Sequence, residues 1–253
     1  MRQLADPQRQ FYAQHHREHT VASVQQQRKK YAAMQQGTMT MAAALAQLND
    51  FVDPSDPDLD EPNLVHAYQT AEMIRRQRPE DTDLQLTGLL HDVGKVLFRW
   101  GEPATQVVGD TFVVGCAYPA SIIHHDALQH NPEAELYPTP CGRYAPHCGL
   151  DRLLLSYGHD EYLYQVLRFN RDRHALPERY WDVVRYHSFY PWHSGGAYRH
   201  LMAPSDEATL RAVQDFNQFD LYSKAEEHFE VTPAMRAYYD RLLRQRFPEP
   251  LRW

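Results

Sequence analysis

The chain has 253 residues, of which 43% are hydrophobic and 23% charged, a composition typical of a globular protein that buries a core. Its formal net charge of -7 leaves no basic excess to neutralise phosphates, so we expect no nucleic-acid partner. The longest purely apolar run, Met41 to Ala46, is far shorter than the roughly 20 residues of a membrane span. We therefore expect no membrane association.

The N-terminal residues and the cysteines bear on the cellular compartment. Residues 1–13 contain no apolar segment, so no secretory or transit signal is expected. Cys116, Cys141 and Cys148 are odd in number and lack a C-x-x-C pair, which argues against a disulfide framework and against a thiolate zinc site. These features predict a cytoplasmic protein with reduced thiols.

Hydrophobic periodicity predicts helices along most of the chain. Residues 8–36 fit a supporting surface helix, and a second helix over 39–49 leads into an acidic loop at 53–58, where two prolines exclude regular structure. Residues 101–148 are irregular, apart from a candidate strand at 106–114. Further helices are predicted over 64–78, 82–98, 150–168, 177–188, 207–223 and 232–246. No repeat or linker divides the chain, so we predict one mainly α-helical domain over residues 1–253.

Polar residues gather on one side of the predicted helix that contains residues 83–99. At 100° per residue, His91, Asp92 and Lys95 lie opposite a complete apolar stripe, with Gly88 beside them. An imidazole and a carboxylate in this arrangement can bind a metal. An ordinary solvated face with an Asp–Lys pair explains the same pattern. Periodicity alone leaves both interpretations open.

Other predicted helices carry polar residues on their apolar faces. His159 and His187 each lie at the centre of an apolar arc, and Asp220 and Lys224 share a face with aliphatic residues. A carboxylate there must be paired or bound to a metal, because an isolated buried charge is costly. His66 lies off the apolar stripe of its helix, and the pattern predicts that it is exposed.

The residue types leave the metal open. Imidazole and carboxylate ligands without thiolate suit Fe, Mn, Zn or Ni. The chain contains no H-E-x-x-H, G-x-S-x-G, G-x-x-x-x-G-K or G-x-G-x-x-G, so zincin, serine hydrolase, P-loop and Rossmann interpretations lack their signatures. The absence of E-x-x-H excludes the usual motif of carboxylate-bridged di-iron bundles.

The order of His66, His91-Asp92, His159-Asp160 and Asp220 is the H…HD…H…D order of the HD-domain metalloproteins, which are helical bundles around one or two metals. Longer strings are more specific: Asp53-Pro-Ser-Asp-Pro-Asp, Gly88-Leu-Leu-His-Asp-Val-Gly-Lys-Val-Leu97, Val107-Val-Gly-Asp-Thr-Phe112, Ala145-Pro-His-Cys-Gly-Leu150, Gly158-His-Asp-Glu-Tyr-Leu-Tyr-Gln-Val166, Arg185-Tyr-His-Ser-Phe-Tyr-Pro-Trp-His193 and Asp215-Phe-Asn-Gln-Phe-Asp-Leu-Tyr222. Together they resemble the inositol oxygenase family over roughly residues 9–253.

The resemblance implies an HD-domain-like helical bundle around a dinuclear centre. In the family pattern, one iron has the ligands His66, His91, Asp92 and Asp220. Asp92 bridges to a second iron, which is held by His159 and His187. The implied cluster is mixed-valent, Fe(II)/Fe(III). The implied enzyme is a ring-cleaving oxygenase that converts myo-inositol and O₂ to D-glucuronate. This assignment contradicts the exposure that periodicity predicts for His66.

The resemblance also assigns substrate contacts and partners. Lys95 is the expected catalytic residue, donating to the substrate oxygen that becomes an alkoxide. Asp160 is expected to orient a neighbour instead of binding iron. The expected partners are a small cyclitol and O₂, with an unidentified reductant. The substrate contacts implied by the family are Asp53, Ser55, Lys95, Gly109, Asp110, Ser188 and Lys224.

Two features depart from the family pattern. The family has an Arg-Asn-Tyr motif before its first helix whose arginine contacts substrate, and this sequence does not contain it. Arg2 has different neighbours, so it is not assigned that role. The pair His124-His125 matches no family function and is expected at the surface.

Two other classes of function compete with the oxygenase. An HD-type metal-dependent phosphohydrolase uses the same ligand types, but it needs cationic groups to hold phosphate. Only Lys95 and Lys224 lie near the predicted ligands, which disfavours that reaction. A metal-dependent sensor or helical scaffold without enzymatic activity would have little use for Lys95, Ser188 and Lys224 beside the ligands.

Overall fold

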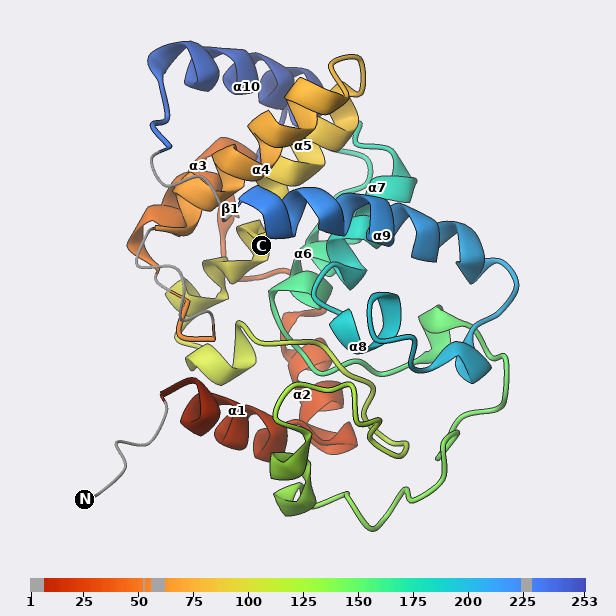
Figure 1. Cartoon of the computed structure of the whole chain (residues 1–253). Coiled ribbons are helices and arrows are strands. Elements are labelled where there is room, and N and C mark those ends of the chain that lie inside the picture. The colour runs from red at the N-terminus through yellow and green to blue at the C-terminus, as the bar shows by residue number, and fades with distance from the viewer. Residues whose placement is uncertain (1–6, 52, 56–61, 224–228) are drawn as a thin grey trace, which may run out of the picture.

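The computed structural model describes residues 7–51, 53–55, 62–223 and 229–253, and this part of the chain is mainly helical, as predicted (Figure 1). The longer helices are α1 (Pro7–Glu18), α2 (Val21–Tyr31), α3 (Met41–Gln47), α4 (Asn63–Gln77), α5 (Thr82–Leu90), α6 (His159–Phe169), α7 (Glu178–Tyr186), α9 (Asp206–Ser223) and α10 (Pro233–Arg246). The predicted helices over 64–78, 177–188, 207–223 and 232–246 are confirmed to within two residues.

Helices α4, α5, α6, α7 and α9 contact one another at the centre of the fold. Close packing of α4 on α5 depends on Gly88, because a Cβ at this position would lie 2.6 Å from Cδ1 of Ile74 and 3.3 Å from the backbone of Ala71. Contacts with α5 and α9 bury more than one side of α4. His66 on this helix is therefore only 5% exposed, and the periodicity-based prediction that it is exposed is wrong.

The predicted helix over 8–36 is two helices. The break falls at His19 and Thr20, where Thr20 caps α2 through a reciprocal pair of hydrogen bonds with Ser23. Both helices contribute to the core, since Tyr12 and Val24 are almost fully buried. The segment therefore supports the fold, but it is neither continuous nor confined to the surface.

The predicted helix over 82–98 ends earlier than expected. Helix α5 stops at Leu90, and after His91 and Asp92 the chain continues as the 3₁₀ helix η2 (Val93–Trp100). At this change of geometry, Nδ1 of His91 lies 2.7 Å from the carbonyl oxygen of Gly88. The interpretation of His91, Asp92 and Lys95 as a solvated face is also wrong, because their exposed fractions are 1%, 3% and 6%.

The predicted helix over 150–168 begins only at His159. Before it, Leu150–Arg152 form a 3₁₀ turn and residues 153–158 run extended. This extended segment pairs with the predicted strand at 106–114 through hydrogen bonds from Val114 N to Leu154 O and from Ser156 N to Phe112 O. The pairing gives a single β-bridge instead of a strand. Residues 101–148 are otherwise turns and short 3₁₀ helices, as expected.

The C-terminal residues pair with the segment that precedes α3. The predicted helix over 39–49 is α3 followed by a 3₁₀ turn, Leu48–Asp50. Strand β1 (Thr38–Met39) pairs antiparallel with β2 (Leu251–Arg252), so that Met39 lies opposite Leu251. The fully buried Trp253 donates its indole N–H to the carbonyl oxygen of Met39 over 3.1 Å. The C-terminal residues are thus part of the core.

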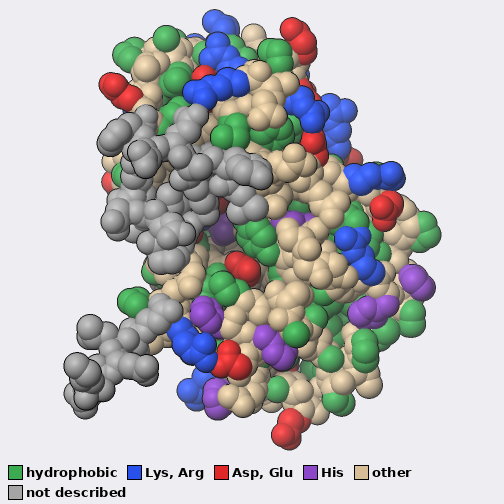
Figure 2. Space-filling model, viewed as in Figure 1, with side chains coloured by type: hydrophobic (Ala, Val, Ile, Leu, Met, Phe, Trp, Pro, Cys, Tyr) green, Lys and Arg blue, Asp and Glu red, His purple; other side chains and the backbone are tan. Residues whose placement is uncertain are grey.

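The surface carries charges of both signs. On the face drawn in Figure 2, Lys and Arg side chains alternate with Asp and Glu side chains among the described residues. Of the expected surface pair, His125 is exposed and His124 is half-buried beside Tyr12. Within the described ranges, none of the helices combines the length and the apolar character needed to cross a membrane.

Candidate metal centre

Three helices bring a first group of candidate ligands together. His66 lies on α4, His91 and Asp92 follow α5, and Asp220 lies on α9. Oδ1 of Asp220 is 2.9 Å from Nε2 of His66 and 3.4 Å from Nε2 of His91. One ligand atom from each of His66, His91 and Asp92 lies within 4.8 Å of the others. These three side chains could therefore hold one metal ion.

A second group shares Asp92 with the first. His159 is the first residue of α6, and His187 follows the last residue of α7. Oδ1 of Asp92 lies 3.1 Å from Nε2 of His159 and 3.6 Å from Nε2 of His187, and the two imidazole nitrogens are 3.2 Å apart. Oδ2 of Asp92 lies 3.5 Å from Nε2 of His91, in the first group. Asp92 can therefore serve two neighbouring ions at once.

Backbone carbonyl groups fix the orientation of three of these imidazole rings. A ring that donates its Nδ1–H to a carbonyl oxygen keeps the Nε2 lone pair available for a metal. The contacts are 2.7 Å for His91 with Gly88, 2.8 Å for His159 with Val107 and 2.8 Å for His187 with Val184. These contacts favour the tautomer that metal binding requires.

The carboxyl groups of Asp92 and Asp220 are anionic at neutral pH. Burial raises the pKa of Asp92, but Lys95 and the neighbouring imidazoles hold that pKa well below its usual range. His91 and His66 have the same effect on the pKa of Asp220, again against burial. For His159, burial lowers the pKa, but Asp160 and Asp92 raise it to about 10. A metal that binds His159 must therefore displace a proton.

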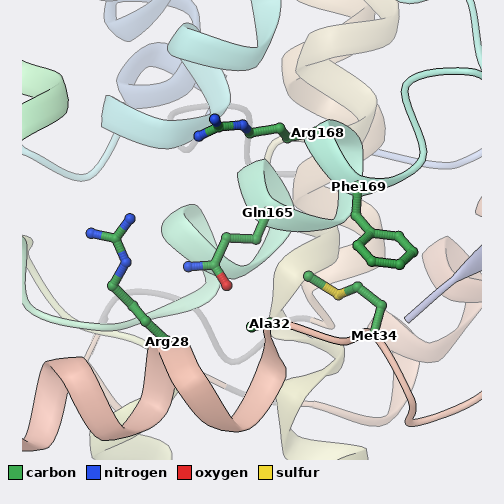
Figure 3. Close-up of a pocket in the computed structure, with 6 residues that line it drawn as sticks. All are labelled: Arg28, Ala32, Met34, Gln165, Arg168 and Phe169. Atoms are coloured by element: carbon green, nitrogen blue, oxygen red, sulfur yellow. The ribbon is translucent and has the colours of Figure 1, made fainter.

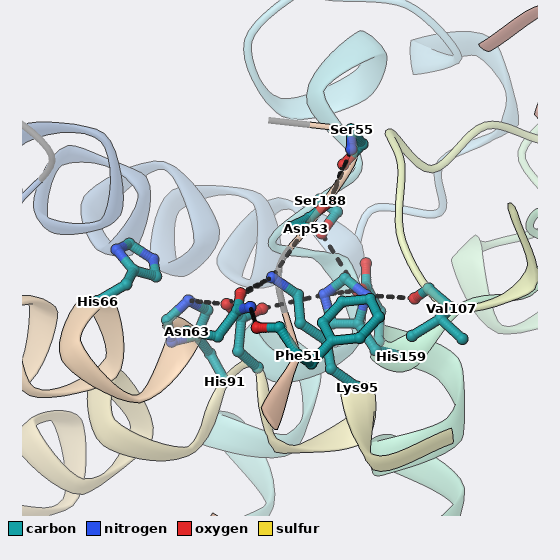
Figure 4. A network of polar contacts seen from close by, with 12 residues as sticks. Phe51, Asp53, Ser55, Asn63, His66, His91, Lys95, Val107, His159 and Ser188 are labelled. Carbon is teal, nitrogen blue, oxygen red and sulfur yellow. Dashed lines mark hydrogen bonds and ion pairs between the residues drawn. The ribbon is translucent and has the colours of Figure 1, made fainter. Parts of the chain in front are cut away.

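Lys95 joins the centre to the segment before α4 (Figure 4). Its Nζ lies 2.9 Å from Oδ2 of Asp92, 2.9 Å from Oδ2 of Asp53 and 2.8 Å from Oδ1 of Asn63. Asp53 in turn accepts hydrogen bonds from the hydroxyl and the backbone N–H of Ser55. Burial lowers the pKa of Lys95, but Asp53 and Asp92 more than compensate and raise it. The side chain is thus a fully hydrogen-bonded ammonium.

Other predicted substrate residues connect to the centre through Asp160. Ser188 donates its hydroxyl proton to Oδ1 of Asp160 over 3.1 Å, and Oδ1 lies 2.8 Å from Nε2 of His159. The backbone N–H of Thr111 donates to the carbonyl oxygen of Ser188, which connects Ser188 to the segment at Gly109 and Asp110. Gly109 has a φ of +109°, a conformation that favours glycine. Lys224 and Arg2 lie outside the described residues.

Three residues of the site were not predicted from the sequence. Asn63 accepts from Lys95, and the Thr111 hydroxyl donates to Oδ2 of Asp160. Tyr190 lies within electrostatic range of Asp220, Asp110, Asp92 and Asp160, and its burial together with these charges raises its pKa well above the usual range. Asn63 and Thr111 lie at a helix start and in a loop, where periodicity gives no signal.

A separate pocket lies away from these ligands. It has a volume of about 380 Å³ between the C-terminal part of α2 and α6, with the side chains of Arg28, Gln165 and Phe169 on its walls (Figure 3). None of the predicted site residues lines it. The chemistry of the protein is therefore inferred from the two groups of candidate metal ligands and not from this cavity.

An all-helical bundle whose buried centre brings together imidazoles and carboxylates from α4, α5, α6, α7 and α9 defines a helical metalloprotein. The sequence identifies the family. The profile of the myo-inositol oxygenase family matches residues 5–253, so the chain belongs to this family.

Relatives in animals and plants agree with this assignment. Inositol oxygenase of Rattus norvegicus is 47% identical over 241 residues, which cover 94% of this chain and 84% of the rat protein. Inositol oxygenase of Homo sapiens is 45% identical with the same coverage, and inositol oxygenase 5 of Arabidopsis thaliana is 43% identical over 96% of this chain and 78% of its own length. The chain is an enzyme of the oxygenase class that binds metal and acts on a small molecule, and the phosphohydrolase alternative is not favoured.

Proposed function

We propose that this enzyme opens the ring of myo-inositol with O₂ to give D-glucuronate at a mixed-valent Fe(II)/Fe(III) centre. The observation that carries the proposal is the sharing of Asp92 between two buried groups of ligands. We assign His66, His91, Asp92 and Asp220 to one iron. Asp92, His159 and His187 are assigned to the other.

The donor atoms fit such a centre. Imidazole nitrogen and carboxylate oxygen suit iron, and no thiolate takes part among the assigned ligands. The anionic Asp92 and Asp220 balance positive charge in a site from which water is largely excluded. When bound, iron would supply Lewis acidity toward a substrate hydroxyl and a place for the reduction of O₂, whose electrons come from the substrate.

The surrounding polar groups suit a neutral polyol. We assign substrate contacts to Asp53, Ser55, Lys95, Gly109, Asp110, Ser188 and Lys224. Lys95 is placed to donate to a substrate oxygen beside Asp92, where negative charge grows as that oxygen loses its proton. Asp53 can accept a hydrogen bond from a neighbouring hydroxyl. A site built from several such hydrogen bonds rejects analogues that lack the matching hydroxyls.

The charges near the centre oppose binding of a phosphate. Lys95 is already paired with two carboxylates, Asp53 and Asp92. A phosphate ester beside them would meet two negative charges within hydrogen-bond distance of that single ammonium.

The alternative of a metal-dependent sensor also leaves Lys95 without a role. A sensor without catalytic activity does not require a buried ammonium in contact with a candidate ligand. Both alternatives therefore explain Lys95 less well than a polyol substrate does.

Three further assignments complete the proposal. We infer that residues 1–253 form one domain. Near the C-terminus, helix α10 contacts α3 and strand β2 pairs with β1, so distant parts of the sequence pack together. We infer a cytoplasmic location, in keeping with three free cysteines. An external reductant would restore the mixed-valent state of the cluster.

The test is a direct assay. Protein loaded with iron is incubated with myo-inositol under O₂, and D-glucuronate and O₂ consumption are measured. The proposal expects one O₂ consumed per glucuronate formed, and no hydrolysis of p-nitrophenyl phosphate by the same sample. Phosphatase activity without glucuronate formation would establish the competing reaction instead.

A further inference from the structure

A buried ion pair joins the two helices that carry His159 and His187. Glu161 lies two residues after His159 on α6, and Arg185 lies two residues before His187 on α7. Nε of Arg185 donates to Oε2 of Glu161 over 2.8 Å, and the two side chains are only 2% and 4% exposed. The proposed metal centre does not use this pair.

Both partners are held by additional contacts. Oε1 of Glu161 lies 3.2 Å from the guanidinium of Arg28 and accepts a hydrogen bond of 2.9 Å from Gln165. Arg185 also makes hydrogen bonds of 2.5 Å to Asp151 and 3.0 Å to the Tyr186 hydroxyl, and its guanidinium lies 4.3 Å from the centre of the Tyr164 ring. The pair therefore has a single defined geometry.

The geometry points to Glu161 and Arg185 as positioning residues for the second ion site. This inference rests on the proposed two-iron function. The Nε2 atoms of His159 and His187 belong to residues on different helices, and both would have to reach the same ion. A relative shift of α6 and α7 by about 1 Å would separate them too far for good coordination. Each residue of the pair lies two positions, about half a helical turn, from its histidine, and the bond between them resists such a shift.

The first ion site provides an internal reference. Its proposed ligands come from α4, the end of α5 and α9, and none of them lies on α6 or α7. Loss of the Glu161–Arg185 bond should therefore weaken the second site and leave the first intact. A general loss of stability would weaken both.

The test compares E161Q with a matched control, R246Q. Arg246 on α10 makes hydrogen bonds of 2.6 and 3.0 Å to Asp83 at the start of α5, so R246Q also breaks an ion pair between helices. Helix α10 carries no candidate ligand, and Asp83 lies at the end of α5 away from His91 and Asp92. Wild-type protein and both variants are titrated with ferrous iron under anaerobic conditions, and unfolding by urea is measured in parallel. In E161Q the second iron should bind about 10–100-fold more weakly, with the first unchanged. R246Q should lose stability and keep both affinities.

Other outcomes decide against the inference. Unchanged binding of the second iron in E161Q, or equal weakening of both sites, would show that the ion pair serves only the fold. If E161Q does not fold, R185K retains the charge but cannot reproduce the Nε contact, and it is read by the same criteria. A wild-type chain that binds only one iron would contradict the proposed centre itself, which separates that failure from a failure of the positioning role.

Discussion

A Cβ atom on Gly94 would lie 2.0 Å from the carbonyl oxygen of His159. Helix η2, which follows Asp92, therefore touches the first turn of α6 with its backbone. This contact brings Asp92 and His159 within reach of each other across the centre. A glycine at position 94 is required because any side chain would push the two segments apart.

The first prediction follows from this contact. Overpacking of a core usually costs about 1–3 kcal/mol. Substitution G94A should destabilise the protein by more than this, because the added Cβ clashes with backbone and not with a flexible side chain. The matched control is G158A. A Cβ on Gly158 would have an ordinary 3.4 Å contact with the backbone of Val107, so this variant should lose only about 1 kcal/mol, the usual cost of alanine at a helix N-cap. Urea unfolding measures both, and equal stability of the two variants would contradict the packing described here.

The ligand order could be predicted from the sequence, but the ligand environment could be predicted only in part. Periodicity grouped His91, Asp92 and Lys95 correctly even though α5 ends at Leu90, because residues i and i+3 of a 3₁₀ helix lie on the same side, which keeps Lys95 beside Asp92. It failed for His66. Helix α4 packs against both α5 and α9, so one apolar stripe underestimates how much of its surface is buried.

Loops and caps account for the rest of the differences. The roles of Asn63 and Thr111 depend on backbone paths that place them beside Lys95 and Asp160, and no local pattern in the sequence encodes those paths. The break between α1 and α2 has a local signal in Thr20 and Ser23, a form of capping box that hydrophobic periodicity does not detect. The fold class depends on hydrophobic periodicity added up over many helices, so single errors do not change it. It was therefore more predictable than the surroundings of the site residues.

The second prediction separates ligands from their supports. Asp160 accepts hydrogen bonds from the hydroxyls of Ser188 and Thr111, whereas Asp92 is shared by both groups of candidate ligands. D160N should retain two irons per chain, because an amide oxygen still accepts from Ser188 and the Thr111 hydroxyl can reorient. D92N should lose most of its iron. Metal content by mass spectrometry decides, and equal loss in the two variants would overturn the ligand assignment.

The third prediction concerns acid stability and His16. This ring is fully buried and its Nε2–H donates to the carbonyl oxygen of Ile123, while burial, aided by neighbouring histidines, lowers its pKa to about 4. The unfolded chain has the ordinary value of about 6.5, so it takes up the proton first as the pH falls. The contribution of neutral His16 is complete above pH 6.5, declines between pH 6.5 and 4, and is absent below pH 4.

The size of this effect can be measured with H16Q. A difference of 2.5 pKa units, from 6.5 to about 4, corresponds to at most about 3 kcal/mol. Gln retains a donor for Ile123 but does not titrate. In the same metal state, the free energy of unfolding of H16Q should therefore fall less than that of wild type between pH 6.5 and 4. Parallel pH profiles for the two proteins would show that His16 is already charged in the fold.

The last prediction is that Lys95 serves the reaction and not the retention of metal. Its three N–H bonds point to Asp53, Asp92 and Asn63, and a protonated amine has no lone pair with which to bind iron. A substrate oxygen that takes the place of one of these acceptors would gain a donor whose interaction strengthens as negative charge develops. Loss of one such donor typically costs about 2.7–4 kcal/mol of barrier, or about 10²–10³-fold in turnover. K95M should therefore bind two irons and form glucuronate about 10²–10³-fold more slowly.

Removal of the Lys95 ammonium also leaves two buried carboxylates, Asp53 and Asp92, without a cation. The double variant K95M/D53N removes one of these charges and should recover stability. It serves to confirm metal binding if the single variant is unstable. Wild-type turnover in K95M, or loss of both irons from both variants, would assign Lys95 a structural role in place of a catalytic one.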